Sequence, residues 1–108
     1  MNSLNKVILI GNVKESPTLR KFNNGTPVTN LMIATNDYLG GGKEITEWHR
    51  LQLDGNIAKS ACENLQKGDL IYIEGSLKTK ISHDKKAGVD RFTTEIVVTF
   101  LEKFTGAK

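Results

Sequence analysis

The chain has 108 residues, with 15 Lys and Arg against 12 Asp and Glu, which gives a formal net charge of +3. This length suits one domain with one modest core, and 38% hydrophobic residues are typical of a globular protein, not a disordered one. The charge permits a nucleic-acid partner without arguing for one. No apolar run approaches the ~20 residues of a membrane span, and the N-terminus does not resemble a signal peptide. We therefore expect a cytoplasmic protein.

Cysteine and histidine are too scarce for an internal disulfide or a metal site. Cys62 is the only cysteine, and we interpret it as a small buried hydrophobe within a helix. With only His49 and His83 beside it, a zinc site within one chain is not expected. The sequence also lacks a phosphate-binding loop and the signatures of serine and zinc hydrolases. It therefore predicts no cofactor, no metal and no catalysis.

The first half of the chain is rich in patterns typical of β-strands. Residues 5–13 are apolar on both faces and predict a buried strand. Residues 17–24 predict a turn, a short strand and a second turn. Residues 28–35 and 45–53 predict two long strands, and three successive glycines at 40–42 predict a flexible hairpin tip between them.

One helix is predicted after these strands. Apolar residues recur at helical spacing over 57–65. Asn56 is the expected N-cap and Gly68 the expected C-cap, with Lys67 complementing the helix dipole.

Two further strands complete the predicted order. A strand over 70–81 has Leu77 and Ile81 among its core-facing residues and a bulge at Gly75, and a hairpin over 84–89 leads to the last strand, 91–101. Five strands with a helix between the third and the fourth is the layout of the OB-fold, a partly open Greek-key barrel. We therefore predict an all-β fold with one helix, in which residues 1–108 form a single OB-fold domain.

Trp48 and Arg50 are the strongest candidates for a binding surface. Leu51 and Leu53 take the core face of their strand, so Trp48 and Arg50 point outward. An outward indole can stack on a base while the neighbouring guanidinium meets a phosphate. A tryptophan covered by a loop or a subunit contact is the alternative that the sequence leaves open.

Several cations are candidates for phosphate contacts. Lys78 and Lys80 alternate along one strand face, where they either track a phosphodiester backbone or protect a solvated strand edge. The other candidates are scattered in sequence, and each taken alone is equally well explained as plain surface: Lys6, Lys14, Arg20, Lys21, Lys43 and Lys67. His49 has no acid or nucleophile partner that the sequence identifies, so we interpret it as a structural or interface histidine.

Five segments run in order along the chain: NKVILIGNV at 5–13, LMIATN at 31–36, TEWHR at 46–50, LQKGDLIYIEG at 65–75 and DRFTTEIVV at 90–98. Together they resemble the bacterial and mitochondrial single-stranded DNA-binding proteins. The resemblance implies an OB-fold homotetramer, with a dimer as the alternative, that wraps single-stranded DNA. It also implies binding without sequence preference, in replication, recombination or repair and in association with the nucleoid.

The resemblance assigns roles to individual residues. Trp48 would stack on bases, and His49 would lie in the subunit interface. Phosphate contacts would come from Lys6, Arg20, Arg50, Lys67, Lys78 and Lys80. We add Tyr38 and Lys43, beside the glycine-rich hairpin tip, as further DNA-binding candidates.

The chain departs from the family pattern at three stacking positions. Family aromatics are matched here by Leu39, Asp54 and Ser82, and Tyr38 is a candidate replacement for the ring at Leu39. Fewer rings favour an alternative function, a primosome-type or assembly OB protein that acts mainly through protein partners. The chain also ends without the acidic C-terminal tail that many members carry, so tail-dependent replication and repair partners are not expected.

Overall fold

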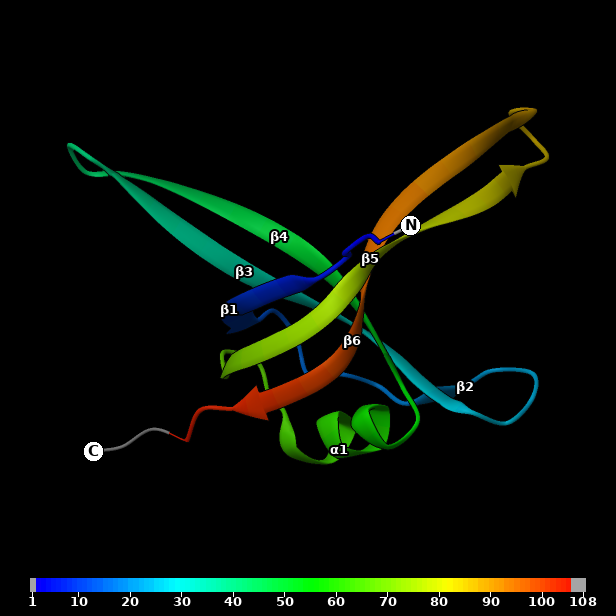
Figure 1. The fold of residues 1–108 in the computed structure, drawn as a ribbon, viewed down its shortest axis with the longest axis horizontal. Helices are drawn as coiled ribbons and strands as arrows, with labels where there is room; N and C mark the ends of the chain where they lie inside the picture. The colour runs from blue at the N-terminus through cyan, green and yellow to red at the C-terminus, as the bar shows by residue number, and fades with distance from the viewer. Residues whose placement is uncertain (1, 106–108) are drawn as a thin grey trace.

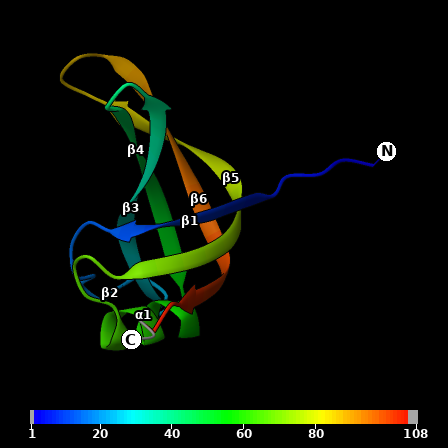
Figure 2. The same cartoon turned by 90° about the vertical axis from the view of Figure 1, so that its left-hand side faces the viewer.

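The computed structural model describes residues 2–105 (Figure 1). The elements, in chain order, are β1 (Val7–Val13), β2 (Arg20–Lys21), β3 (Pro27–Gly40), β4 (Lys43–Asp54), α1 (Asn56–Asn64), β5 (Leu70–Asp84) and β6 (Val89–Lys103). Their order matches the sequence prediction, but the structure extends β3, β5 and β6 by several residues. The added residues form two long hairpins, β3–β4 and β5–β6, that project from the end of the barrel opposite α1 (Figure 2).

The strands close into a barrel. The sheet order is β1-β5-β6-β4-β3-β2, and β1 also pairs with β3, so the five long strands form a ring with β2 added beside β3. Asn12 lies opposite Ala34, and Val13 lies opposite Ile33, in the pairing that closes the ring. The helix follows the third long strand, which confirms the predicted OB-fold. Within residues 2–105, no helix has the length and apolar character of a membrane span.

Apolar side chains from the long strands and the helix fill the barrel. Leu51 and Leu53 point inward from β4, as their alternation predicts. Ala58 and Ala61 are buried on α1, and these small side chains let the helix close one end of the barrel. The buried cluster comprises Val13, Leu31, Ile33, Leu51, Leu53, Ala58, Ala61, Leu65, Ile71, Ile73, Ile96 and Val98.

Two glycines allow backbones to approach closely where strands change partners. A Cβ atom at Gly11 would lie 2.5 Å from the carbonyl oxygen of Ala34, at the point where β1 turns from β5 to β3. A Cβ atom at Gly75 would lie 2.3 Å from the carbonyl oxygen of Val97. The register between β5 and β6 shifts between Glu74 and Gly75, so a bulge occurs at the predicted place, but on the partner strand and not on β5. The unpaired residue, Thr99, lies on β6.

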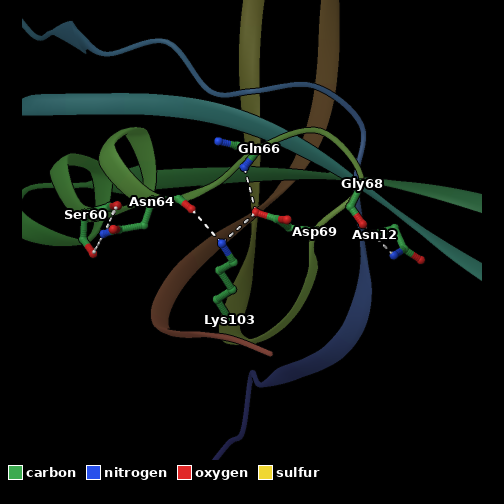
Figure 3. A network of polar contacts seen from close by, with 7 residues as sticks. All are labelled: Asn12, Ser60, Asn64, Gln66, Gly68, Asp69 and Lys103. Atoms are coloured by element: carbon green, nitrogen blue, oxygen red, sulfur yellow. Dashed lines mark hydrogen bonds and ion pairs between the residues drawn. The ribbon is translucent and has the colours of Figure 1, made fainter. Parts of the chain in front are cut away.

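A polar network fixes the loop between α1 and β5 (Figure 3). Lys103 Nζ donates to the Asn64 carbonyl oxygen at 3.1 Å and lies 3.3 Å from Asp69 Oδ2. The Gln66 backbone N–H donates to the same carboxylate oxygen at 2.8 Å. This hydrogen bond, with a smaller contribution from Lys103, lowers the pKa of the Asp69 carboxyl group. The end of the helix, the loop and the last strand are thereby joined beside the end of β1.

The predicted helix caps are wrong. The N-cap is Gly55, not Asn56, and no side chain caps the helix. The helix ends at Asn64 with Leu65 as its C-cap, so Lys67 and Gly68 lie beyond the last turn. Gly68 instead adopts a φ of 92° and donates its N–H to the Val13 carbonyl oxygen. The glycine therefore serves the contact between loop and barrel, and this long-range contact has no local sequence signal.

The predicted burial of two strands is also wrong in part. Ile8 and Ile10 on β1 are about half exposed, and Leu77 and Ile81 on β5 are exposed as well. Alternation places these side chains on the expected faces, but within residues 2–105 no element covers the outer face of β1. Ile81 lies opposite Phe92, in the part of the β5–β6 hairpin where β6 does not pair with β4, whereas Leu77 lies opposite Ile96, the first residue of β6 that pairs with β4.

We expect Gly75→Ala to lower the free energy of unfolding by about 1–3 kcal/mol, because the new methyl group would overlap a backbone carbonyl that cannot rotate away. Thr94→Ala in the same hairpin is the matched control, since Thr94 is exposed, and should change stability by less than about 0.5 kcal/mol. Urea unfolding followed by circular dichroism, at one fixed protein concentration, measures both. Equal stability of Gly75→Ala and the parent would contradict the close approach.

Candidate nucleic-acid interface

The outer face of the β3–β4 hairpin carries the predicted stacking residue. Trp48 lies opposite Ala34, and Arg50 lies opposite Met32; residues directly opposed on antiparallel strands share a face. The Trp48 side chain is 48% exposed, and Arg50 is exposed beside it. The indole is thus presented on a rigid strand next to a guanidinium, as the sequence predicts.

Lys14 completes this surface from a distant part of the chain. Its Nζ lies 5.2 Å from the centre of the Trp48 ring, within the range of a cation–π contact. Its backbone N–H donates to the Met32 carbonyl oxygen at 2.9 Å, which fixes the start of the loop after β1 against β3. The sequence identified Lys14 only as one of several scattered cations, because the contact depends on barrel closure.

A shallow hollow of about 570 Å³ lies next to Trp48 on the same face. Three of its lining residues are cations, namely Lys14, Arg20 and Arg50, and two are acids, Glu15 and Glu95. The Arg20 guanidinium donates to the Asn30 Oδ1 atom, which holds it on the wall of the hollow. The structure therefore brings together two of the predicted phosphate contacts and adds a third cation.

The β5–β6 hairpin carries the other pair of predicted cations. Lys78 is exposed, and within residues 2–105 it makes no ion pair. Lys80 differs, since its Nζ lies 2.9 Å from Glu95 Oε1 and donates to Gln52 Oε1. The two lysines share a face, but they are not equally available to a ligand.

The remaining predicted residues are dispersed. Tyr38 and Lys43 are exposed near the tip of the β3–β4 hairpin, and Lys67 is exposed in the loop before β5. Lys6 precedes β1, and its Nζ lies 3.8 Å from Glu74 Oε1. His49 is half-buried on the face of β4 opposite Trp48, and its Nε2 atom lies 2.9 Å from Thr35 Oγ1. Their roles stay predictions.

The positions where family aromatics are missing differ in environment. Leu39 and Ser82 are exposed, whereas Asp54 is half-buried and accepts a hydrogen bond from Gln52 Nε2 at 3.1 Å. Among the exposed rings that the sequence analysis did not identify, Phe92 is 67% exposed and lies opposite Ile81. It lies on the face of β5–β6 that continues the core, away from Lys78.

Among residues 2–105 there is no group of three or more His, Cys, Asp or Glu side chains that could hold a metal ion. An exposed indole, a hollow lined by cations and a strand face with lysines are the parts that a nucleic-acid strand requires. Fold and site together define an OB-fold nucleic-acid-binding module.

Comparison with known proteins identifies the family. The sequence profile of the Single-strand binding protein family matches residues 4–104, so the chain belongs to this family and binds single-stranded DNA. Its structure is similar to that of the Plasmodium falciparum SSB in complex with ssDNA, with a TM-score of 0.85 and 32% sequence identity. The match covers 97% of this chain and 98% of the Plasmodium chain. Members of the family are DNA-binding proteins without enzymatic activity.

Trp48 provides a direct test of the interface, because it is the only tryptophan. We expect saturating single-stranded DNA to quench its fluorescence, since a stacked base contacts the indole. Trp48→Ala should weaken binding by about 1–3 kcal/mol, measured by anisotropy of a labelled oligothymidine. Unchanged emission at saturation would place Trp48 outside the DNA path.

Proposed function

We propose that the chain binds single-stranded DNA without sequence preference and protects it during replication, recombination or repair. The observation that supports this most strongly is the position of Trp48 beside the hollow lined by Lys14, Arg20 and Arg50. Every base has a π-face on which an indole can stack, and cations bind phosphates whatever the sequence. A surface made of these two kinds of contact therefore has little means of reading base identity.

The chemistry also bears on where the protein works. The Plasmodium falciparum relative binds ssDNA in its solved complex. Single strands arise where a duplex is opened for copying, exchange or repair, so a binder of this kind belongs beside the chromosome. We accordingly propose a cytoplasmic protein associated with the nucleoid. The alternative of a mainly protein-binding assembly factor is not favoured by family membership.

A salt titration tests the electrostatic half of this proposal. Binding of oligothymidine should weaken with salt, at about −0.7 logarithmic units of affinity per logarithmic unit of salt for each neutralised phosphate. Arg50→Ala should reduce that slope by about 0.7 and leave the ranking of different oligonucleotides unchanged. Lys59→Ala on the exposed side of α1 is the matched control and should leave the slope intact. A slope near zero in the parent would contradict the proposal.

We further propose that the protein assembles as a homotetramer. One outer surface, formed by β1, β5 and β6, supports this, since directly opposed residues place Ile8, Ile10, Tyr72, Glu74 and Phe100 on one face. Ile8, Ile10 and Phe100 are each about half exposed. The Phe100 ring meets Tyr72 edge-on, with ring centres 6.0 Å apart. We call this set of five residues the β1 face.

The β1 face is suited to contact with the same face of a second copy of the chain. Apolar side chains gathered on one exposed face mark interaction sites in single domains. A tetramer built from two-fold axes needs two such surfaces on each protomer, and His49 on β4 is the candidate for the second. A dimer that uses only one of these surfaces is the alternative assembly.

The β1 face can be tested by charge insertion. The double variant Ile8→Glu/Ile10→Glu should shift the molar mass measured by light scattering toward smaller species, because buried carboxylates would have no partner. Lys59→Glu on α1 is the matched control and should retain the parent mass. A monomeric parent protein would overturn the tetramer, and an unchanged mass in the double variant would exclude the β1 face.

A further inference from the structure

Lys80 is held in a line of polar contacts that crosses three strands. Its Nζ on β5 lies 2.9 Å from Glu95 Oε1 on β6 and donates to Gln52 Oε1 on β4. Gln52 in turn donates through Nε2 to both carboxylate oxygens of Asp54, at 3.1 and 3.3 Å. The Lys80 ammonium group is therefore linked to two carboxylates. It contacts the Glu95 carboxylate directly and is connected to the Asp54 carboxylate through the Gln52 amide.

Burial makes the pair of Glu95 and Lys80 unlike the other ion pairs. The Glu95 side chain is 8% exposed, whereas that of Lys80 is 44% exposed. The Glu95 Oε1 atom is buried and accepts no hydrogen bond from residues 2–105, so the contact with Lys80 is an ion pair without hydrogen-bond geometry. A carboxylate withdrawn from water in this way depends on the counter-charge in contact with it.

A DNA phosphate that drew Lys80 away from Glu95 would leave the buried carboxylate without its partner. A phosphate that bound Lys80 in its present position would share the ammonium charge with Glu95 and lie close to a second negative charge. Glu95 also lines the hollow that holds Arg20 and Arg50, so its charge acts on both cation groups of the surface. Lys78, on the same strand face, has no ion pair among the described residues.

We infer that Glu95 is an affinity-determining residue that withholds Lys80 from the DNA, so that Lys78 is the phosphate contact of the β5–β6 hairpin. The carboxylate competes with a backbone phosphate for the Lys80 ammonium group. This inference rests on the proposed DNA path, and it differs from the role that family resemblance implies for Lys80.

The test compares salt slopes for binding of a labelled oligothymidine to the full chain, measured by anisotropy. Glu95→Gln should release Lys80, steepen the slope by about 0.7 and tighten binding about fivefold at 0.1 M salt. Lys80→Ala/Glu95→Gln removes both charges of the pair and should return the slope to that of the parent. Lys78→Ala is the matched control on the same face and should reduce the slope by about 0.7.

Two outcomes would overturn the inference. One is a Glu95→Gln variant that is folded by circular dichroism but binds no tighter than the parent. The other is a Lys80→Ala/Glu95→Gln variant whose slope falls as far as that of Lys78→Ala, because Lys80 would then contact phosphate in the parent. Absence of binding by the parent itself would instead contradict the proposed function.

Lysine acylation of the parent protein, read by mass spectrometry, gives a second measurement that needs no variant. Saturating oligothymidine should protect Lys78 from acylation and leave the reactivity of Lys80 unchanged, because Lys80 stays paired with Glu95. Equal protection of the two lysines by DNA would overturn the inference.

Discussion

Barrel closure at Gly11 is the constraint on which the binding surface depends. At this residue β1 leaves β5 and joins β3, and the carbonyl oxygen of Ala34 occupies the space that a side chain would fill. Three residues further on, the chain lies against β3, where the Lys14 N–H donates to the Met32 carbonyl oxygen. This contact sets the loop over the outer face of β3 and β4, which creates the hollow and places the Lys14 ammonium over Trp48.

The amino-acid pattern predicted which way the strand residues point better than whether they are buried. Alternation correctly set Leu51 inward and Trp48 outward, because a strand has a period of two whatever surrounds it. The same rule placed Ile8 and Ile81 on apolar faces, but burial also requires a covering element, and no described part of the chain covers these faces. The prediction of the helix caps failed for a related reason, because Gly68 donates its N–H to Val13, a residue far away in sequence.

The candidate site was predictable where one strand carries it and unpredictable where several strands meet. Trp48 and Arg50 are two residues apart on β4, so their common face follows from the sequence. Lys14 reaches Trp48 only after closure, and Lys80 reaches Glu95 only in the register of the β5–β6 hairpin that sets Lys80 opposite Thr93. Local patterns can therefore identify cations as candidates, but the availability of each cation is decided by the acids that folding brings beside it.

The pairing of some cations with acids bears on the proposed assembly. Lys6, Lys80 and Lys103 all lie in ion pairs, and the acids Glu15 and Glu95 line the hollow beside the arginines. At the hollow, a single barrel thus offers a DNA strand three cations, offset by two acids, and one ring beside them. When several barrels are joined, a strand bound at one surface is held at high effective concentration near the next. In the proposed tetramer, tight wrapping then arises from many modest contacts, and each segment of the strand can still detach while the rest stays bound.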